Sequence, residues 1–222
     1  MKSILIVGMS RFGRHLARKF TELGHQVLAA DLDEGRIQEV LPYVEDGKIC
    51  DCTKEEVLKS LGVANFDICF VTIGSDFQAA LEVTSLAKEL GSPCVITKAN
   101  RDVHMKFFKR NGADEVIYSD RESAERLAIR YSSDSVFDYV QLTKALSLFE
   151  ISPMESWIGK TIEQMAIRTR YRISILATKR GDELMPLPPA SHVFRSDEHL
   201  IVVGEPDRVM DLAENIERQK KA

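Results

Sequence analysis

The stretch that decides the fold of this 222-residue chain is Ser3-Ile4-Leu5-Ile6-Val7-Gly8-Met9-Ser10-Arg11-Phe12-Gly13. Its apolar first part has the character of a buried strand, and the glycine-containing part that follows opens a helical pattern. A second apolar run, residues 26–30, ends at Asp31. This order of strand, glycine turn, helix, strand and acid predicts a dinucleotide-binding βαβ unit.

Each part of this motif has a predicted task. Gly8 allows the tight turn out of the strand, and Gly13 lets the helix pack closely on the sheet. The helix N-terminus offers free N–H groups to a phosphate, and Asp31 lies where a carboxylate accepts from ribose hydroxyls. The middle glycine of the usual G-x-G-x-x-G pattern is Ser10 here, which brings a hydroxyl group to the phosphate position.

Arg11 stands at the mouth of the predicted helix, where the helix dipole disfavours a cation. We interpret it as a phosphate ligand, which favours a nucleotide with a terminal phosphate over NAD. The alternative is a solvated surface arginine.

Strands and helices continue to alternate after Asp31. Thr53, with Glu56 three residues later, predicts a capping box for a helix that ends near Gly62. Asp76 is predicted to cap a helix that stops at Gly91. Further strands are expected at residues 48–51, 66–72, 93–97 and 115–118, and further helices at 102–109 and 122–131. The fold class is therefore α/β, with a Rossmann-type doubly wound parallel sheet that fills residues 1–132.

The pattern changes after a polar break at residues 132–135. We expect a linker over residues 133–145, with 136–140 as a connecting segment, and then a second, smaller α+β domain over residues 146–222. Its expected elements are strands at 146–151, 172–178 and 199–203, helices at 161–167 and from Pro206 to Ile216, and a loop at Pro186, Pro188 and Pro189.

Composition narrows the class of protein. The 30 basic and 34 acidic residues give a net charge of −4, which argues against a nucleic-acid partner. No apolar run is long enough to span a bilayer, and Met1-Lys2 leads directly into a strand without a signal peptide. The four cysteines, Cys50, Cys52, Cys69 and Cys94, have no metal-site spacing and are expected to be reduced thiols of a cytoplasmic protein.

Several motifs in order suggest a family. They are the glycine segment, Asp31, Cys50-Asp51-Cys52-Thr53, Thr72-Ile73-Gly74-Ser75-Asp76 and Ile96-Thr97-Lys98-Ala99, with a βαβββα module after them. Together they resemble the cytosolic RCK (TrkA-N plus TrkA-C) subunits of bacterial Ktr and Trk potassium uptake systems, most closely the KtrA type. The resemblance implies an N-terminal domain that binds ATP, ADP or NAD(H) and a TrkA-C effector and interaction domain. It also implies a homo-oligomer, in which dimers assemble to an octameric ring. The ring docks at the inner face of the cell membrane on a potassium-conducting subunit of the KtrB or TrkH type.

The resemblance also assigns residues. It places Gly8, Ser10 and Gly13 on the phosphates, Arg11 on the terminal phosphate, Asp31 on the ribose, and Asp51 and Cys52 against the adenine. Thr72 and Gly74 flank the ligand, Lys98 lies near the phosphates from the intersubunit side, and Asp120 matches a position that holds a divalent cation between subunits. The expected nucleotide-binding set is completed by Met9, Phe12, Leu32 and Ile73. Cys50 and Cys52 replace the small residues usual in the family, and Asp120 is alternatively an N-cap of the next helix.

We expect a regulator, opened by ATP and closed by ADP, and not an enzyme. The alternatives are a small NAD-dependent oxidoreductase and an NAD(H)-binding redox sensor, including one that binds DNA. Against an enzyme, no acid–base constellation stands out in the second domain, and His104 and His192 each look like solitary surface residues. The sequence leaves open whether ATP/ADP or NAD/NADH is the ligand, and whether cyclic di-AMP binds the second domain.

Overall fold

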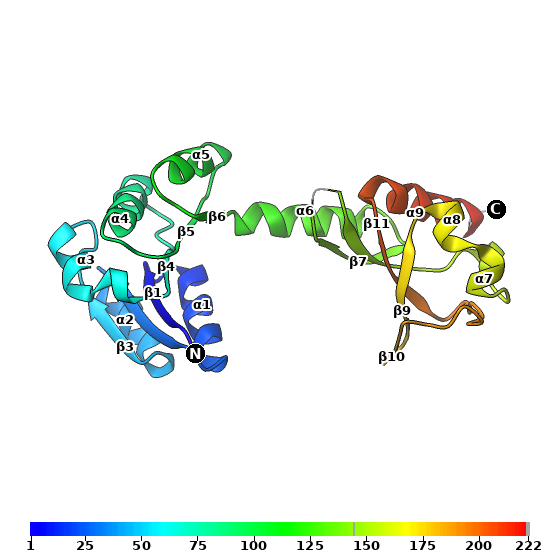
Figure 1. The fold of residues 1–222 in the computed structure, drawn as a ribbon, viewed down its shortest axis with the longest axis horizontal. Helices are drawn as coiled ribbons and strands as arrows, with labels where there is room; N and C mark the ends of the chain where they lie inside the picture. Colours follow the sequence, from blue (N-terminus) through cyan, green and yellow to red (C-terminus); the bar gives the residue numbers. More distant parts are fainter. Residues whose placement is uncertain (144, 221–222) are drawn as a thin grey trace. The chain divides into compact units, whose positions relative to one another are not determined.

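The computed structural model describes residues 1–143 and 145–220 (Figure 1). Contacts divide the chain into two compact units, Met1–Asp120 and Arg121–Ala222, each with its own core. Helix α6 (Ser119–Tyr131) begins in the first and continues in the second. The domain boundaries expected at residues 132 and 146 stay predictions. The expected linker includes Lys144 and the expected second domain includes residues 221–222, which lie outside the described residues.

The first unit is built on a parallel sheet of six strands in the order β3-β2-β1-β4-β5-β6. The order runs outward in both directions from the β1/β4 pair, as in a doubly wound fold, and the predicted fold class is confirmed. The strands are β1 (Ser3–Val7), β2 (Gln26–Asp31), β3 (Asp46–Ile49), β4 (Ile68–Val71), β5 (Val95–Lys98) and β6 (Glu115–Ile117). The helices are α1 (Arg11–Glu22), α2 (Glu34–Val40), α3 (Glu55–Leu61), α4 (Phe77–Glu89) and α5 (Asp102–Arg110), with short 3-10 turns at Leu41–Tyr43 and Val63–Asn65.

Strand β1 supplies both faces of this sheet, because successive strand side chains point in opposite directions. Ile4 and Ile6 belong to the cluster beneath α1 and α2, which Ala17 and Ile37 join. Leu5 and Val7 belong to the cluster on the other face, with side chains from α3, α4 and α5. The side chains of these four β1 residues are at most 2% exposed. The uninterrupted apolar run therefore reflects a strand that is covered on both sides.

The second unit has an antiparallel five-stranded sheet in the order β10-β9-β11-β8-β7. The strands are β7 (Val136–Gln141), β8 (Ser147–Ile151), β9 (Ser174–Arg180), β10 (Glu183–Pro186) and β11 (His199–Gly204). Short helices α7 (Ile162–Met165) and α8 (Ile167–Tyr171), a 3-10 turn at Glu155–Trp157 and the closing helix α9 (Pro206–Lys220) complete it. Its core centres on fully buried Trp157 and Phe149, which confirms a smaller unit with helices and an antiparallel sheet.

Several local predictions are wrong. Helix α2 was not expected, and residues 136–140, expected to be a connecting segment, form β7 and pair with β8. The expected loop at Pro186 is the end of strand β10, and the helix expected at 161–167 is two short helices separated by Ala166, whose φ is 49°.

The predicted capping box is also wrong. The Thr53 hydroxyl donates to the Asp51 side chain at 2.6 Å, and α3 begins at Glu55 without a side-chain cap. By contrast, Asp76 caps α4 as expected, because its carboxylate accepts from the backbone N–H of Ala79 at 3.0 Å. Among the described residues, no helix combines the length and the apolar character needed to cross a bilayer.

A charged cluster on the second sheet makes its stability depend on pH. The Glu150 carboxylate lies 2.8 Å from His199 Nδ1 and 3.1 Å from Lys179 Nζ. Burial raises the pKa of Glu150, but the hydrogen bonds with His199 and Lys179 outweigh burial and hold its pKa below the usual 4.5. A carboxylate with a lowered folded pKa stabilises the fold above about pH 4.5, and the stabilisation is lost as the pH falls through the lowered value.

We therefore expect Glu150→Gln to lower the stability of the second unit by about 1 kcal/mol at pH 7 and to flatten its loss of stability in acid. Hydrogen exchange of the β8 and β11 amides at several pH values measures this without assuming that the whole chain unfolds in one step. The control is Glu183→Gln, which removes an exposed partner of Arg180. Equal effects of the two substitutions would contradict the assignment to the Glu150 cluster.

Candidate nucleotide-binding site

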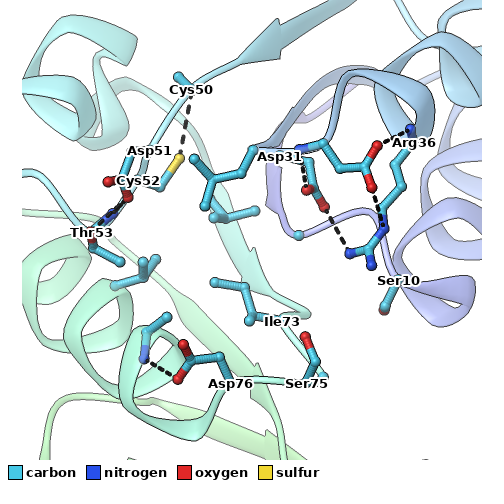
Figure 2. Close-up of a pocket in the computed structure, with 17 residues that line it drawn as sticks. Ser10, Asp31, Arg36, Cys50, Asp51, Cys52, Thr53, Ile73, Ser75 and Asp76 are labelled. Carbon is cyan, nitrogen blue, oxygen red and sulfur yellow. Dashed lines mark hydrogen bonds and ion pairs between the residues drawn. The ribbon is translucent and has the colours of Figure 1, made fainter.

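The carboxyl ends of β1, β2 and β4 enclose a cavity of about 320 Å³. Strand order reverses between β1 and β4, and open α/β sheets bind ligands at such a point. The residues that line it are Val7, Gly8, Ser10, Asp31, Leu32, Asp33, Arg36, Cys50, Asp51, Cys52, Thr53, Ile73, Gly74, Ser75, Asp76, Ala79 and Val83. Figure 2 shows Asp51, Cys52 and Thr53 at one end of this pocket and Arg36 and Ser10 at the other. The structure thus brings together eight of the predicted residues, namely Gly8, Ser10, Asp31, Leu32, Asp51, Cys52, Ile73 and Gly74.

The turn between β1 and α1 is packed too closely for side chains at two positions. Gly8 has φ 94°, and a Cβ there would lie 2.7 Å from the backbone nitrogen of Ile73. A Cβ on Gly13 would lie 2.4 Å from the Gly8 carbonyl oxygen and 2.5 Å from Thr72 Oγ1. Thr72 is buried and donates its hydroxyl to the Gly8 carbonyl. Gly13 and Thr72 therefore pack against the β1–α1 turn on the side away from the cavity, and neither residue lines the cavity.

Ser10 occupies the position of the missing glycine without strain. Its φ of −60° and ψ of 169° are open to any L-residue, so the turn does not require glycine there. Its Oγ accepts from the backbone N–H of Gly13 at 3.3 Å and so caps α1. The hydroxyl hydrogen is free of that contact, because Oγ acts in it as the acceptor.

Asp31 ties together two loops of the pocket. Its carboxylate accepts from the backbone N–H of Met9 and, at 2.9 Å, from that of Asp33. The residue is 8% exposed, and Met9 is fully buried. Asp31 thus fixes the β1–α1 turn relative to the start of α2, in addition to facing the pocket.

Arg36 also lines the pocket, although it is not among the residues predicted from the sequence. It lies on α2, whose N-cap Asp33 accepts from the Arg36 backbone N–H at 3.2 Å. Its guanidinium lies 3.7 Å from the Asp31 carboxylate and 3.5 Å from that of Asp33 (Figure 2). The signal was present in the sequence, since Asp33 followed by Ile37 and Val40 on one face is typical of a short capped helix.

A second cavity of about 390 Å³ adjoins the first and shares Ser10, Arg36, Gly74 and Ser75 with it. The remaining lining residues are Arg11 and Arg14. Among the described residues, this three-arginine cavity has no carboxylate in its wall. It lies at the N-terminus of α1 and is bordered by three arginine residues. The Arg14 guanidinium also pairs with the Glu39 carboxylate at 3.2 Å. Arg11 belongs to this second cavity and not to the first.

At the other end of the pocket, Asp51 accepts from both the backbone N–H and the hydroxyl of Thr53. These two hydrogen bonds lower the pKa of the Asp51 carboxyl. The Cys50 and Cys52 sulfur atoms lie 3.8 Å apart beside it.

The remaining predicted residues lie elsewhere. Lys98 Nζ lies 5.6 Å from the centre of the Phe12 ring, and neither residue lines the pocket. Asp120 is exposed and lies within α6, so it is not the N-cap that the alternative interpretation required. Within residues 1–143 and 145–220, no group of three potential metal-binding side chains occurs.

The two histidines considered as solitary surface residues are both engaged. His104 stacks on Phe77 with ring centres 4.0 Å apart, and burial, helped by the charge of Arg101, lowers its pKa. His192 Nε2 lies 3.0 Å from the buried carboxylate of Glu198, so its interpretation as a solitary residue is wrong.

Comparison with known proteins agrees with this architecture. The TrkA-N domain model matches residues 4–119, and the TrkA-C domain model matches residues 146–217. The chain is 37% identical over 203 residues to the Ktr system potassium uptake protein C of Bacillus subtilis, which covers 91% of this chain and 92% of the relative. It is 30% identical to the Ktr system potassium uptake protein A of the same organism, over 91% of both chains.

Solved structures share the fold at lower identity. The GsuK RCK domain has a TM-score of 0.68 and 19% identity, covering 97% of this chain and 47% of that one. The GsuK channel bound to NAD has a TM-score of 0.69 and 20% identity, covering 97% of this chain and 39% of that one. With both domain models matched in order and the Ktr proteins aligned along nearly their whole length, the chain belongs to the TrkA-N/TrkA-C family of KtrA-like RCK subunits.

Proposed function

We propose that this chain is the nucleotide-sensing regulatory subunit of a potassium uptake system of the Ktr type. In this proposal the first unit binds ATP or ADP, and the chain acts in the cytoplasm as a ring of eight subunits. The ring docks at the inner face of the membrane on a potassium-conducting subunit of the KtrB or TrkH type. Its relatives, the Ktr system potassium uptake proteins, support the physiological role.

The observation that supports a nucleotide as the ligand is the pair of adjoining cavities. The first has Asp31 for ribose hydroxyls and a partly apolar wall that includes Leu32 and Cys52. The second has Arg11, Arg14 and Arg36 around the N-terminus of α1. An adenosine in the first cavity would direct its phosphates into the second, where the positive charge favours a polyphosphate.

The proposed control of potassium flux depends on the terminal phosphate, which ATP has and ADP lacks. A ligand shifts a two-state assembly only when it binds the two states with different affinity. The two nucleotides share adenosine and differ at the terminal phosphate, so the three-arginine cavity would distinguish them. We expect ATP to favour the ring form that opens the pore and ADP to favour the form that closes it.

Reconstitution tests this proposal. The chain is co-purified with a KtrB-type membrane subunit, and potassium flux into liposomes is measured with ATP, ADP or NADH. Faster flux with ATP than with ADP is the expected result. Hydride transfer from NADH to a small metabolite, with flux unaffected by any nucleotide, would favour an oxidoreductase instead.

In this proposal a divalent cation is shared between subunits at Asp120. The described part of one chain offers the exposed Asp120 carboxylate at the family's position and no cluster of three ligands. One copy therefore does not form the site alone, and no part of the proposed control depends on a cation.

Arg11 provides a direct test of the ligand. Charge-assisted hydrogen bonds contribute roughly 1.5–3 kcal/mol, so Arg11→Ala should weaken ATP binding by roughly 10-fold to 150-fold. ADP binding should weaken less, since ADP lacks the terminal phosphate. Calorimetric titration of both nucleotides measures the difference.

Arg18→Ala is the matched control, because Arg18 lies on the same helix, stacks on Tyr43 and does not line either cavity. We expect it to leave both affinities unchanged. Equal losses of ATP and ADP affinity in Arg11→Ala would show that Arg11 does not contact the terminal phosphate.

A further inference from the structure

Two cysteines lie side by side in the wall of the pocket. The Cys50 and Cys52 sulfur atoms are 3.8 Å apart, and both residues line the cavity (Figure 2). The Cys50 backbone N–H donates to the Asp31 carbonyl at 2.9 Å, which extends the pairing of β2 and β3 by one residue. Strand β3 ends at Ile49, and Cys52 begins the turn that precedes α3. The sheet hydrogen bond therefore fixes the backbone of Cys50, and the turn brings Cys52 beside it.

The two thiols differ in access. Cys50 is partly exposed, whereas Cys52 is 5% exposed and belongs to the apolar cluster on that face of the sheet. The other two cysteines do not line the pocket: Cys69 is buried within β4, and Cys94 precedes β5. A small reagent that enters the pocket therefore meets Cys50 first, with Cys52 as its neighbour.

We propose that Cys50 and Cys52 are a redox-modification site that hydrogen peroxide converts to a reversible disulfide in the nucleotide pocket. Burial raises the pKa of the Cys50 thiol, so only a small fraction of it is the thiolate that reacts. The thiolate sulfur attacks the peroxide O–O bond, which leaves a sulfenic acid on Cys50, and the released hydroxide takes up the proton that the thiol lost and becomes the first water. The Cys52 sulfur then attacks the Cys50 sulfur, the S–S bond forms, and the hydroxyl leaves with the Cys52 proton as the second water. The thiols lose two electrons in total, and the peroxide gains them.

The bond would change the shape of the pocket. A disulfide joins its sulfur atoms at about 2.05 Å, so the two side chains must close from their present 3.8 Å. This movement shifts the backbone of Asp51, which lies between the two cysteines at the end of the pocket opposite Arg36. We expect nucleotide affinity to fall about tenfold on oxidation and a bound nucleotide to slow the reaction by covering Cys50. This consequence rests on the proposed function, whereas formation of the bond does not.

Peptide mapping of the full chain tests the proposal. Trypsin cleaves after Lys48 and Lys54, so a single peptide, residues 49–54, contains both cysteines of the pair and neither of the others. After treatment with hydrogen peroxide we expect this peptide to lose the mass of two hydrogens, and dithiothreitol to restore it. Addition of ATP before the peroxide should slow the loss.

Two variants sharpen the result. Cys94→Ser keeps the pair and should behave like the unmodified chain. Cys52→Ser removes the resolving thiol, so Cys50 should instead be trapped as a sulfenic acid by dimedone.

The outcomes are separable. Two thiols that stay free, or a Cys50 oxidised to sulfinic acid without a bond, would overturn the proposal. A disulfide that forms equally fast with ATP, in a protein that binds ATP by titration, would overturn its link to the pocket. A disulfide in a protein that binds no nucleotide would support the bond and contradict the proposed function.

Discussion

Gly13→Ala is expected to destabilise the first unit by about 2 kcal/mol. The added methyl group would lie 2.4 Å from the Gly8 carbonyl oxygen and 2.5 Å from Thr72 Oγ1. Neither group can move away easily, because Thr72 donates to that carbonyl and the Gly8 N–H donates to the Ala30 carbonyl at 2.7 Å. Overpacking costs about 1–3 kcal/mol and here meets backbone, so it outweighs the gain of at most about 1 kcal/mol in helix propensity.

Hydrogen exchange of the β1 and β4 amides in increasing urea measures this loss separately from the second unit. Gly74→Ala is the matched control, since its Cβ would have no neighbour closer than 3.8 Å and its backbone is not left-handed. We expect a change within about 0.5 kcal/mol for the control. A Gly13→Ala protein as stable as the control would show that the turn tolerates a side chain.

Asp31→Ala is expected to affect both stability and binding. The substitution removes the acceptor of the buried Met9 N–H, which costs about 1–3 kcal/mol when no other acceptor replaces it. Affinities for ATP, ADP and NADH should fall alike, because all three contain the adenosine ribose. The exclusion of NADPH should relax, since the carboxylate no longer repels the 2′-phosphate.

Titration of the four ligands measures this pattern, and Asp33→Ala is its control. Asp33 lines the same pocket with an exposed carboxylate, and it caps α2. Its removal should cost helix stability without a uniform loss of affinity. If nucleotide affinity in Asp31→Ala equals that of the unmodified chain, the proposed ribose contact does not exist.

The sequence predicts the first unit well, because its strands carry strong local signals. The run Ile4–Val7 is apolar on both faces, and such a run bounded by a glycine turn has few alternatives to a buried parallel strand. Helix α2 escaped prediction because it has seven residues and Gly35 in its first turn, which weakens its periodic pattern. Because α2 was not predicted, Arg36 on this helix was not predicted to line the pocket either.

The structure of the second unit is harder to predict from the sequence, for a different reason. Strand β7 carries polar Asp138 and Gln141 and makes its ladder with β8, so tertiary pairing decides its conformation. Ala166 adopts φ 49° between two helices, a conformation that its residue type does not signal. The place of Arg11 in a cavity separate from that of Asp31 depends on how α1 and α2 come together, which no local pattern contains.

The three-arginine cavity has a consequence for ionic strength. Arg11 and Arg36 are exposed, so salt screens their attraction for a phosphate over a Debye length of about 8 Å at 0.15 M. Nucleotide affinity should therefore fall as the salt concentration rises. The contribution of the uncharged adenosine to the binding free energy should change little. A cell that accumulates potassium raises its own ionic strength. In the proposed function, in which ATP promotes uptake, that uptake would then weaken ATP binding, which is a negative feedback produced by electrostatic screening.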